Sequence, residues 1–239
     1  MCPTESKTAA IREDRHATSW AAAALLVTLW IGIPWLASAA AAIPLVLGRR
    51  TRHEPPRASL VWRWAAMVFL MGTVMSGLAA ERATRAIPSG AWARDAATTW
   101  LNGSGDAFPS ALAVLVIVTV FAGATLATRG LAGTIVLAEV LLGGAVYASV
   151  VYAHAYNLFP ATAVAVAPWT IALIVGMSAA LSPLGRWGAR FFGRTPSLAS
   201  DPHAHRALIA GAGLVALSIA LRLATGPAIT RLARQLTLP

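Results

Sequence analysis

The chain has 239 residues, of which 57% are apolar and 12% are charged, and its mean hydropathy is +0.66. Soluble domains carry about 25% charged residues, so this composition excludes an ordinary soluble fold and predicts that lipid is the main solvent. The net charge of +10 comes from arginines clustered at the ends of apolar runs, where anionic headgroups favour them, and we therefore expect no binding of nucleic acid.

The N-terminus, residues 1–18, is a polar tail of mixed charge that precedes a long apolar run. That run exceeds the about 7–15 apolar residues of a signal peptide, so we expect it to be retained as a first helix. Cys2 is the one cysteine, which excludes an internal disulfide and a cysteine-rich metal or iron–sulfur site.

The apolar runs predict an all-α fold, a polytopic membrane bundle of about six transmembrane helices. About 20 apolar residues are needed to cross a ~30 Å hydrocarbon core. A single membrane domain, 19–224, is followed by a short C-terminal tail, 225–239. We place the spans near 19–47, 59–80, 109–128, 131–153, 161–182 and 207–224.

The first run, 19–47, is long for one crossing, because as a straight helix it would reach about 42 Å. Pro34 and Pro44 are natural places for a kink or a break. A continuous first span leaves the arginines nearly balanced between the two faces and weakly favours both termini outside. A broken segment would place the N-terminal tail and both arginine-rich loops on the cytoplasmic side, which fits the positive-inside rule better.

The largest polar region between two apolar runs is 81–108, and it contains Trp92 and Trp100. Indole rings prefer the headgroup level of a membrane. We therefore expect a short helix here that lies at the membrane interface.

Glu139 is the strongest functional candidate, because it is the one carboxylate well inside an apolar span. An ionisable group at that depth is costly unless it faces a partner, a cavity or another helix. It could carry a proton, bind a cation or act as a general base, but a structural role, tying two helices together by hydrogen bonds, is favoured. Gly143, one turn further on, leaves room for a close helix or a ligand.

A polar cluster follows at the end of the same helix. All three tyrosines of the chain lie here with one histidine and one asparagine: Tyr147, Tyr152, His154, Tyr156 and Asn157. An aromatic belt at the membrane interface is the favoured interpretation. A polar substrate entrance or a pocket for a quinone headgroup is the alternative.

Three arginines are expected to contact lipid headgroups. Arg49 and Arg50 follow the first apolar run, and Arg63 lies between two tryptophans near the start of the next run. A long basic side chain in such a place extends its charged end to the headgroups.

The loop before the last span contains Asp201, His203 and His205, which are residue types that bind zinc or copper. Their spacing is not specific, so a solvated loop is the expected state and the three residues are weak metal candidates. The sequence predicts no particular cofactor.

No sequence motif decides the function, since the Walker, Rossmann and H-E-x-x-H signatures are absent. The favoured hypothesis is an accessory or structural subunit of a larger complex in a bacterial cytoplasmic membrane, with lipids and other membrane subunits as partners. The second is a small transporter or channel subunit that uses Glu139 as its coupling residue. An enzyme acting on a lipid or quinone ranks last, because acid–base catalysis needs two groups within hydrogen-bond reach.

Overall fold

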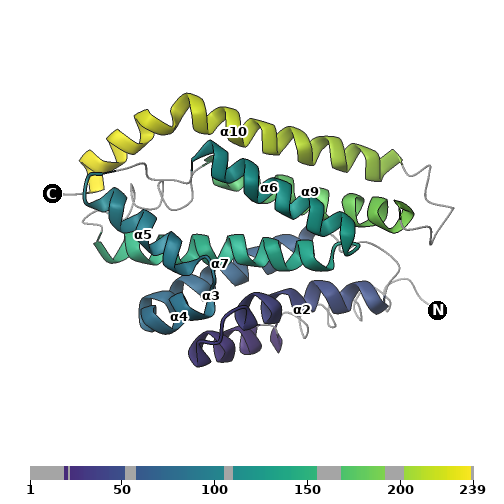
Figure 1. The fold of residues 1–239 in the computed structure, drawn as a ribbon, viewed down its shortest axis with the longest axis horizontal. Helices are drawn as coiled ribbons and strands as arrows, with labels where there is room; N and C mark the ends of the chain where they lie inside the picture. The colour runs from purple at the N-terminus through teal and green to yellow at the C-terminus, as the bar shows by residue number, and fades with distance from the viewer. Residues whose placement is uncertain are drawn as a thin grey trace, which may run out of the picture.

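The computed structural model describes residues 19–20, 22–51, 58–104, 110–154, 168–191 and 202–237 (Figure 1). Every regular element in these ranges is a helix, which confirms the all-helical prediction for this part of the chain. Helical residues 22–31 come first. They are followed by α2 (Leu36–Thr51), α3 (Ala58–Leu78), α4 (Ala80–Ala86), α5 (Gly90–Leu101), α6 (Ala111–Ala127), α7 (Leu131–His154), α9 (Pro168–Phe191) and α10 (Pro202–Thr237).

Helix α7 lies in the middle of the bundle and contacts α2, α3, α5, α6 and α9 (Figure 1). It is apolar all round, as expected of a helix surrounded by others, and residues such as Leu137, Leu141 and Val151 are buried. Small residues let its neighbours approach closely: a Cβ added at Gly72 of α3 would lie 2.8 Å from the Ala145 Cβ. Such packing is the usual basis of helix association in lipid.

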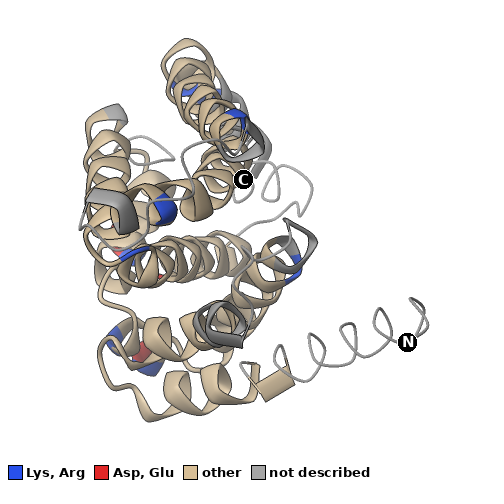
Figure 2. Cartoon of the chain, turned by 90° about the vertical axis from the view of Figure 1, so that its right-hand side faces the viewer, with Lys and Arg blue, Asp and Glu red and all other residues tan. Residues whose placement is uncertain are grey.

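Helix α10 packs along α9 on the other side of the bundle, and the closest approach is between two glycines. A Cβ added at Gly176 would lie 2.7 Å from the carbonyl oxygen of Gly211, and one at Gly211 would lie 2.8 Å from that of Gly176. Viewed along the helix axes, the helices are stacked in layers in which charged residues are sparse (Figure 2). This is the arrangement expected of helices that pack within a membrane.

Among the described residues, three helices are long and apolar enough to cross a membrane: Leu131–His154, Thr170–Gly188 and His205–Ala228. Helices α3 and α6 contain shorter apolar stretches, Arg63–Leu78 and Leu112–Ala127. The structure is thus compatible with a membrane protein that has three candidate spans, and a count of six remains a prediction.

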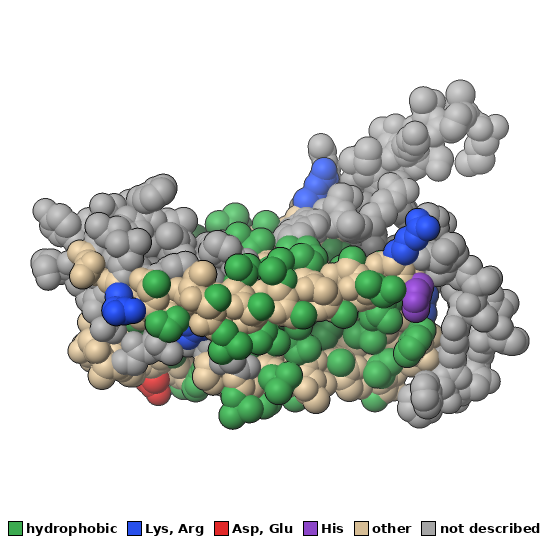
Figure 3. All heavy atoms as spheres, turned by 90° about the horizontal axis from the view of Figure 1, so that it is seen from above, with side chains coloured by type: hydrophobic (Ala, Val, Ile, Leu, Met, Phe, Trp, Pro, Cys, Tyr) green, Lys and Arg blue, Asp and Glu red, His purple; other side chains and the backbone are tan. Residues whose placement is uncertain are grey.

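Helix α10 is much longer than the predicted span 207–224, because the predicted C-terminal tail continues the helix to Thr237. Its 36 residues correspond to about 54 Å. The helix bends near Pro227, the residue type that most often causes a kink (Figure 1). Hydrophobic side chains are spread along its outer face (Figure 3). Only 17% of the apolar stretch within its candidate span His205–Ala228 is buried in the protein.

The first apolar run is broken at Gly32–Trp35. Gly32 has φ 76° and Trp35 has φ 66°, a left-handed conformation that is costly for a bulky residue. The chain reverses there, so that α2 runs back alongside residues 22–31 (Figure 1). Of the two proline positions suggested by the sequence, only Pro34 is at the break, since Pro44 lies inside α2.

The described part of the predicted interfacial segment 81–108 contains two helices, α4 and α5, joined by a tight turn, and residues 105–108 lie outside the described residues. Trp92 is 50% exposed, which suits an interfacial position. Trp100 is fully buried, so the expectation that both indoles lie at the headgroups is wrong for this residue. Helix α5 packs against α7, and this contact places the α4–α5 turn beside the middle of the central helix.

Candidate functional site

The Glu139 side chain joins three segments of the chain. The backbone N–H of Ser89 donates a hydrogen bond to Oε1 of Glu139, with N and O 2.6 Å apart. The Ser38 hydroxyl donates a short hydrogen bond to Oε2. A weaker bond runs from the Ser89 hydroxyl to the backbone oxygen of Glu139 at 3.4 Å. We refer to Ser38, Ser89 and Glu139 together as the Glu139 junction.

Each of the two serines lies near the start of a helix that follows an interruption. Ser38 is in the first turn of α2, just after the break at Gly32–Trp35, and Ser89 is the N-cap residue of α5. The first N–H groups of a helix have no partner within the helix, and the helix dipole favours negative charge there. The Glu139 carboxyl group therefore supplies an acceptor where two helices begin.

Glycines allow this close approach. A Cβ added at Gly143 would lie 2.5 Å from the Ser89 Oγ, so the space that the sequence predicted beside Glu139 is occupied by Ser89. A Cβ at Gly90 would lie 3.0 Å from the Thr84 backbone, so a larger residue there would separate α4 from α5. The turn can reach α7 only because both positions lack a side chain.

The junction lies well inside the central helix. Glu139 is eight residues from the start of α7, about 12 Å along its axis. Non-helical backbone at such a depth is tolerated only where it is buried in protein or lines a cavity. The turn meets this requirement, since Ile87 is fully buried and the Ser89 N–H is bonded to Glu139.

The break before α2 packs against α4. Gly32 approaches the Arg82 backbone, with 3.5 Å between an added Cβ and the Arg82 oxygen. The Arg82 guanidinium lies 4.5 Å from the centre of the Trp30 ring, a cation–π contact. The break before α2 therefore packs against α4, the helix that leads into the α4–α5 turn.

The predicted polar cluster at the end of α7 does not form one site with Glu139. Tyr147 is buried, Tyr152 is half-buried and His154 is exposed. The His154 ring nitrogen Nδ1 lies 2.8 Å from the Val150 oxygen of its own helix. His154 is 15 residues from Glu139, about 22 Å along the axis. Tyr156 and Asn157 lie outside the described residues.

The weak metal candidates are not assembled in the part of the chain that the structure describes. His205 is exposed at the start of α10, Asp201 lies outside the described residues, and so does the side chain of His203. No group of three or more metal-binding side chains occurs among the described residues. We therefore assign no metal or cofactor to any residue.

Of the arginines expected at lipid headgroups, Arg63 is exposed on α3, in agreement with that role. Arg49 and Arg50 belong to α2, but their side chains lie outside the described set. The headgroup contacts themselves remain predictions.

Sequence reasoning identified Glu139 but missed its partners. Ser38 lies in an alanine-rich run and gives no signal of its own. Ser89 carries a partial signal, since Pro88-Ser89-Gly90 is a typical helix-start sequence. Arg222 was also missed, although it is 6% exposed within a candidate span.

Comparison with known proteins gives no relative: no protein family, no curated protein and no solved structure matches the chain. The function must therefore be argued from the geometry of the site.

Proposed function

We propose that this chain is a small proton-linked membrane transport protein in which Glu139 is the coupling group. The supporting observation is that two interrupted helical segments meet at one carboxyl group in the middle of the central helix. In secondary transporters, ion and substrate sites lie where such discontinuous helices meet near the middle of the bilayer. An ionisable residue within the membrane is itself a functional candidate by default.

The chemistry of the junction favours a proton over a metal cation. A cation site requires converging oxygen acceptors. Here two donors, the Ser89 N–H and the Ser38 hydroxyl, point at the carboxyl oxygens instead.

Protonation of Glu139 would alter the junction in a defined way. The Ser89 N–H can only donate, so it fits an acceptor oxygen in either state. The Ser38 hydroxyl can donate or accept, so it can turn to accept the new O–H of a protonated carboxyl group. Gain or loss of one proton at Glu139 would thereby alter the contact between α2 and α7, because Ser38 of α2 is bonded to Glu139 of α7. Coupling between a site and a moving segment requires such a two-state element.

The reversal at Gly32–Trp35 supports one orientation. If residues 22–31 and α2 form a hairpin that enters and leaves on one side, the N-terminal tail and the arginine-rich loops around 48–58 and 183–206 lie on the same face. The positive-inside rule makes that face cytoplasmic. In this arrangement α3, α6, α7, α9 and α10 are the crossings.

A proteoliposome assay tests the proposal. The full chain is reconstituted with a pH-sensitive dye inside, a pH gradient is imposed, and ionic solutes are added outside one at a time: amino acids, monocarboxylates, phosphate and quaternary ammonium ions. We expect one class to change the proton flux. Glu139→Gln should abolish that change while the protein stays monodisperse, and Glu81→Gln, at an exposed residue of α4, should retain it. Unchanged flux in Glu139→Gln, or no response to any solute, would reject the proposal.

The second candidate is the accessory subunit that the sequence favours, and the outer face of α10 supports it. Ile209, Leu217 and Leu223 are exposed on this helix, which packs mainly on α9. In this role the Glu139 junction is purely structural. Mild-detergent purification from the native membrane separates the two functions, since a subunit should retain stoichiometric partners and a transporter should be isolated alone.

A further inference from the structure

A buried charged side chain, independent of the Glu139 junction, lies in α10. Arg222 is 6% exposed and belongs to the candidate span His205–Ala228. Burying an arginine among helices in lipid is costly and marks a functional site by default. The Glu139 hypothesis gives this residue no role.

The Arg222 side chain lies along its own helix toward the bend. Any side chain at Gly226 would collide with Nη1 of Arg222, so the guanidinium rests on bare backbone one turn further on. Thr230 follows after another turn and is 5% exposed. Its hydroxyl has no hydrogen-bond partner among the described residues. Residues four apart lie on the same helix face, so Gly226, on which the guanidinium rests, and Thr230 lie on one face of α10.

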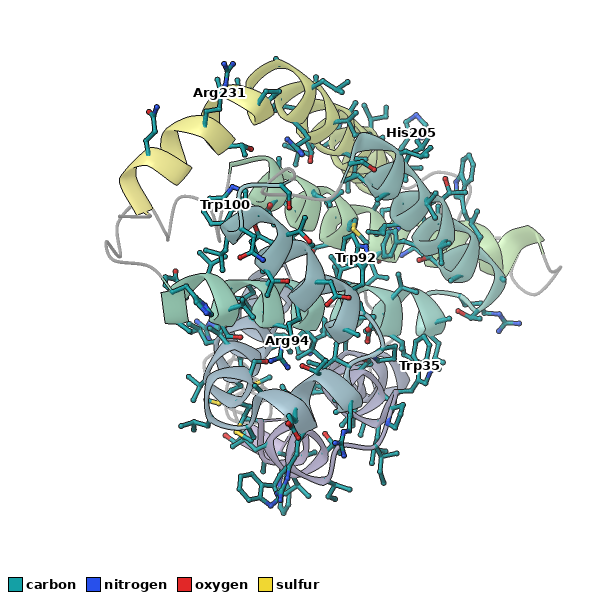
Figure 4. All side chains as sticks on the ribbon, turned by 60° about the vertical axis from the view of Figure 1, so that its left-hand side comes forward. Trp35, Trp92, Arg94, Trp100, His205 and Arg231 are labelled. Atoms are coloured by element: carbon teal, nitrogen blue, oxygen red, sulfur yellow. The ribbon has the colours of Figure 1, made fainter. Side chains whose placement is uncertain are left out.

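An aromatic residue from another helix lies near that part of α10. Trp100, fully buried at the end of α5, faces the C-terminal part of α10 (Figure 4). Arg231 points away from the bundle on the opposite side of α10 (Figure 4), and its Nε donates to the Pro227 oxygen at 3.3 Å.

We propose that Arg222 and Thr230 form part of a binding site for an oxyanion, the phosphate or carboxylate group of a ligand. A guanidinium carries five N–H donors in a planar fork that matches such groups. It therefore has donors for a ligand in addition to its contacts within the protein. The buried hydroxyl of Thr230 supplies a further donor, and Trp100 supplies an apolar wall for the rest of an amphiphilic ligand.

The site is separate from the Glu139 junction, because Arg222 and Thr230 belong to α10, whereas the junction joins α2, α5 and α7. Arg222 is 20 residues from the start of α10, about 30 Å along its axis, which is the thickness of a hydrocarbon core. The oxyanion can therefore belong to a lipid headgroup or to a soluble anion. Basic sites between membrane helices are known to bind headgroups.

Thermal unfolding and native mass spectrometry of the full chain in neutral detergent test the site. The probes are phosphatidylglycerol, phosphatidylcholine as the zwitterionic control, and inorganic phosphate. We expect phosphatidylglycerol or phosphate to raise the Tm and to remain bound in the spectrum. Binding of phosphatidylglycerol alone identifies a headgroup site, and binding of phosphate identifies a site for a soluble oxyanion.

Two variants assign the effect to these residues. Thr230→Val keeps the shape and the arginine but removes one donor, so it should weaken binding about tenfold, the effect of one hydrogen bond to a charged group. Thr225→Val is its matched control, because the Thr225 hydroxyl already donates to the Leu221 oxygen at 2.7 Å. Arg222→Gln should abolish binding, and if it fails to fold, Thr230→Val still decides. The site is rejected if neither anion raises the Tm, or if Thr230→Val binds as tightly as Thr225→Val.

Discussion

Gly143→Ala provides the sharpest test of the Glu139 junction, because the new methyl group would enter the space occupied by Ser89. The added Cβ would lie 2.5 Å from the Ser89 Oγ and 3.3 Å from its Cβ. Overpacking of this kind costs about 1–3 kcal/mol. Replacing glycine with alanine inside a helix gains about 1 kcal/mol. The net effect should be a loss of about 0–2 kcal/mol in the free energy of unfolding.

The neighbouring glycine supplies a matched control. A Cβ at Gly144 would meet only the Phe69 ring, at an ordinary 3.7 Å. Gly144→Ala should therefore show the helix gain alone and stabilise the protein by up to about 1 kcal/mol. The gap between the two variants should be about 1–3 kcal/mol, or ~2–10 °C in Tm for a chain of this size.

A double-mutant cycle identifies the atom responsible. Ser89→Ala removes the Oγ that the new methyl group meets and loses only the weak 3.4 Å bond to the Glu139 oxygen. In that background Gly143→Ala should lose most of its penalty, which gives a coupling energy of about 1–2 kcal/mol. Thermal unfolding in detergent measures all four proteins. Equal effects of Gly143→Ala and Gly144→Ala on stability would refute the proposed packing of the turn on α7. Additive effects of Gly143→Ala and Ser89→Ala would refute it as well.

Three further predictions concern the rest of the bundle. Glu139→Ala should lower the free energy of unfolding by about 2–4 kcal/mol, because the Ser89 N–H and the Ser38 hydroxyl lose their acceptor. Glu139→Gln keeps a hydrogen-bond partner for both groups and should cost under about 1 kcal/mol. Chemical unfolding in mixed micelles compares the two variants, and equal losses would contradict the hydrogen-bonding scheme. Gly188→Ala would drive a methyl group into the Leu126 carbonyl and should destabilise by about 1–3 kcal/mol. Gly123→Ala, which faces open space, should be neutral or stabilising in the same assay, and the reverse order would show that α6 and α9 do not meet there. Trp64→Phe should cost about 1–3 kcal/mol, since the buried Trp64 indole donates to a backbone oxygen at 2.6 Å; a neutral result in thermal unfolding would mean that this bond adds nothing.

The central helix was predictable because hydropathy alone determines it. The expected span 131–153 and the observed Leu131–His154 agree within a residue. Prediction was poorer where tertiary contacts decide the conformation. Pro34 and Pro44 give the same local signal, yet α2 continues through Pro44, while the chain at Gly32 is held against Arg82 of α4.

The candidate site was predictable only in part. Glu139 could be identified because a carboxyl group stands out in an apolar helix. Its partners could not, because Ser89 is 50 and Ser38 is 101 positions away in the sequence, and no local pattern links such distant residues. Trp100 shows the same limit: an indole typical of an interface is buried because α5 turns toward the bundle interior.

The separation of the junction residues along the chain has a consequence for synthesis in the cell. Ser38 emerges from the ribosome 101 residues before Glu139. At a synthesis rate of about 5–20 residues per second, the carboxyl group that accepts from the Ser38 hydroxyl is made roughly 5–20 s after Ser38. The turn before α5 waits about half as long. During this interval the Ser89 N–H and the Ser38 hydroxyl lack this acceptor, and lipid offers no replacement. We therefore expect the nascent chain to remain within the translocon, or at the aqueous interface, until α7 has been made.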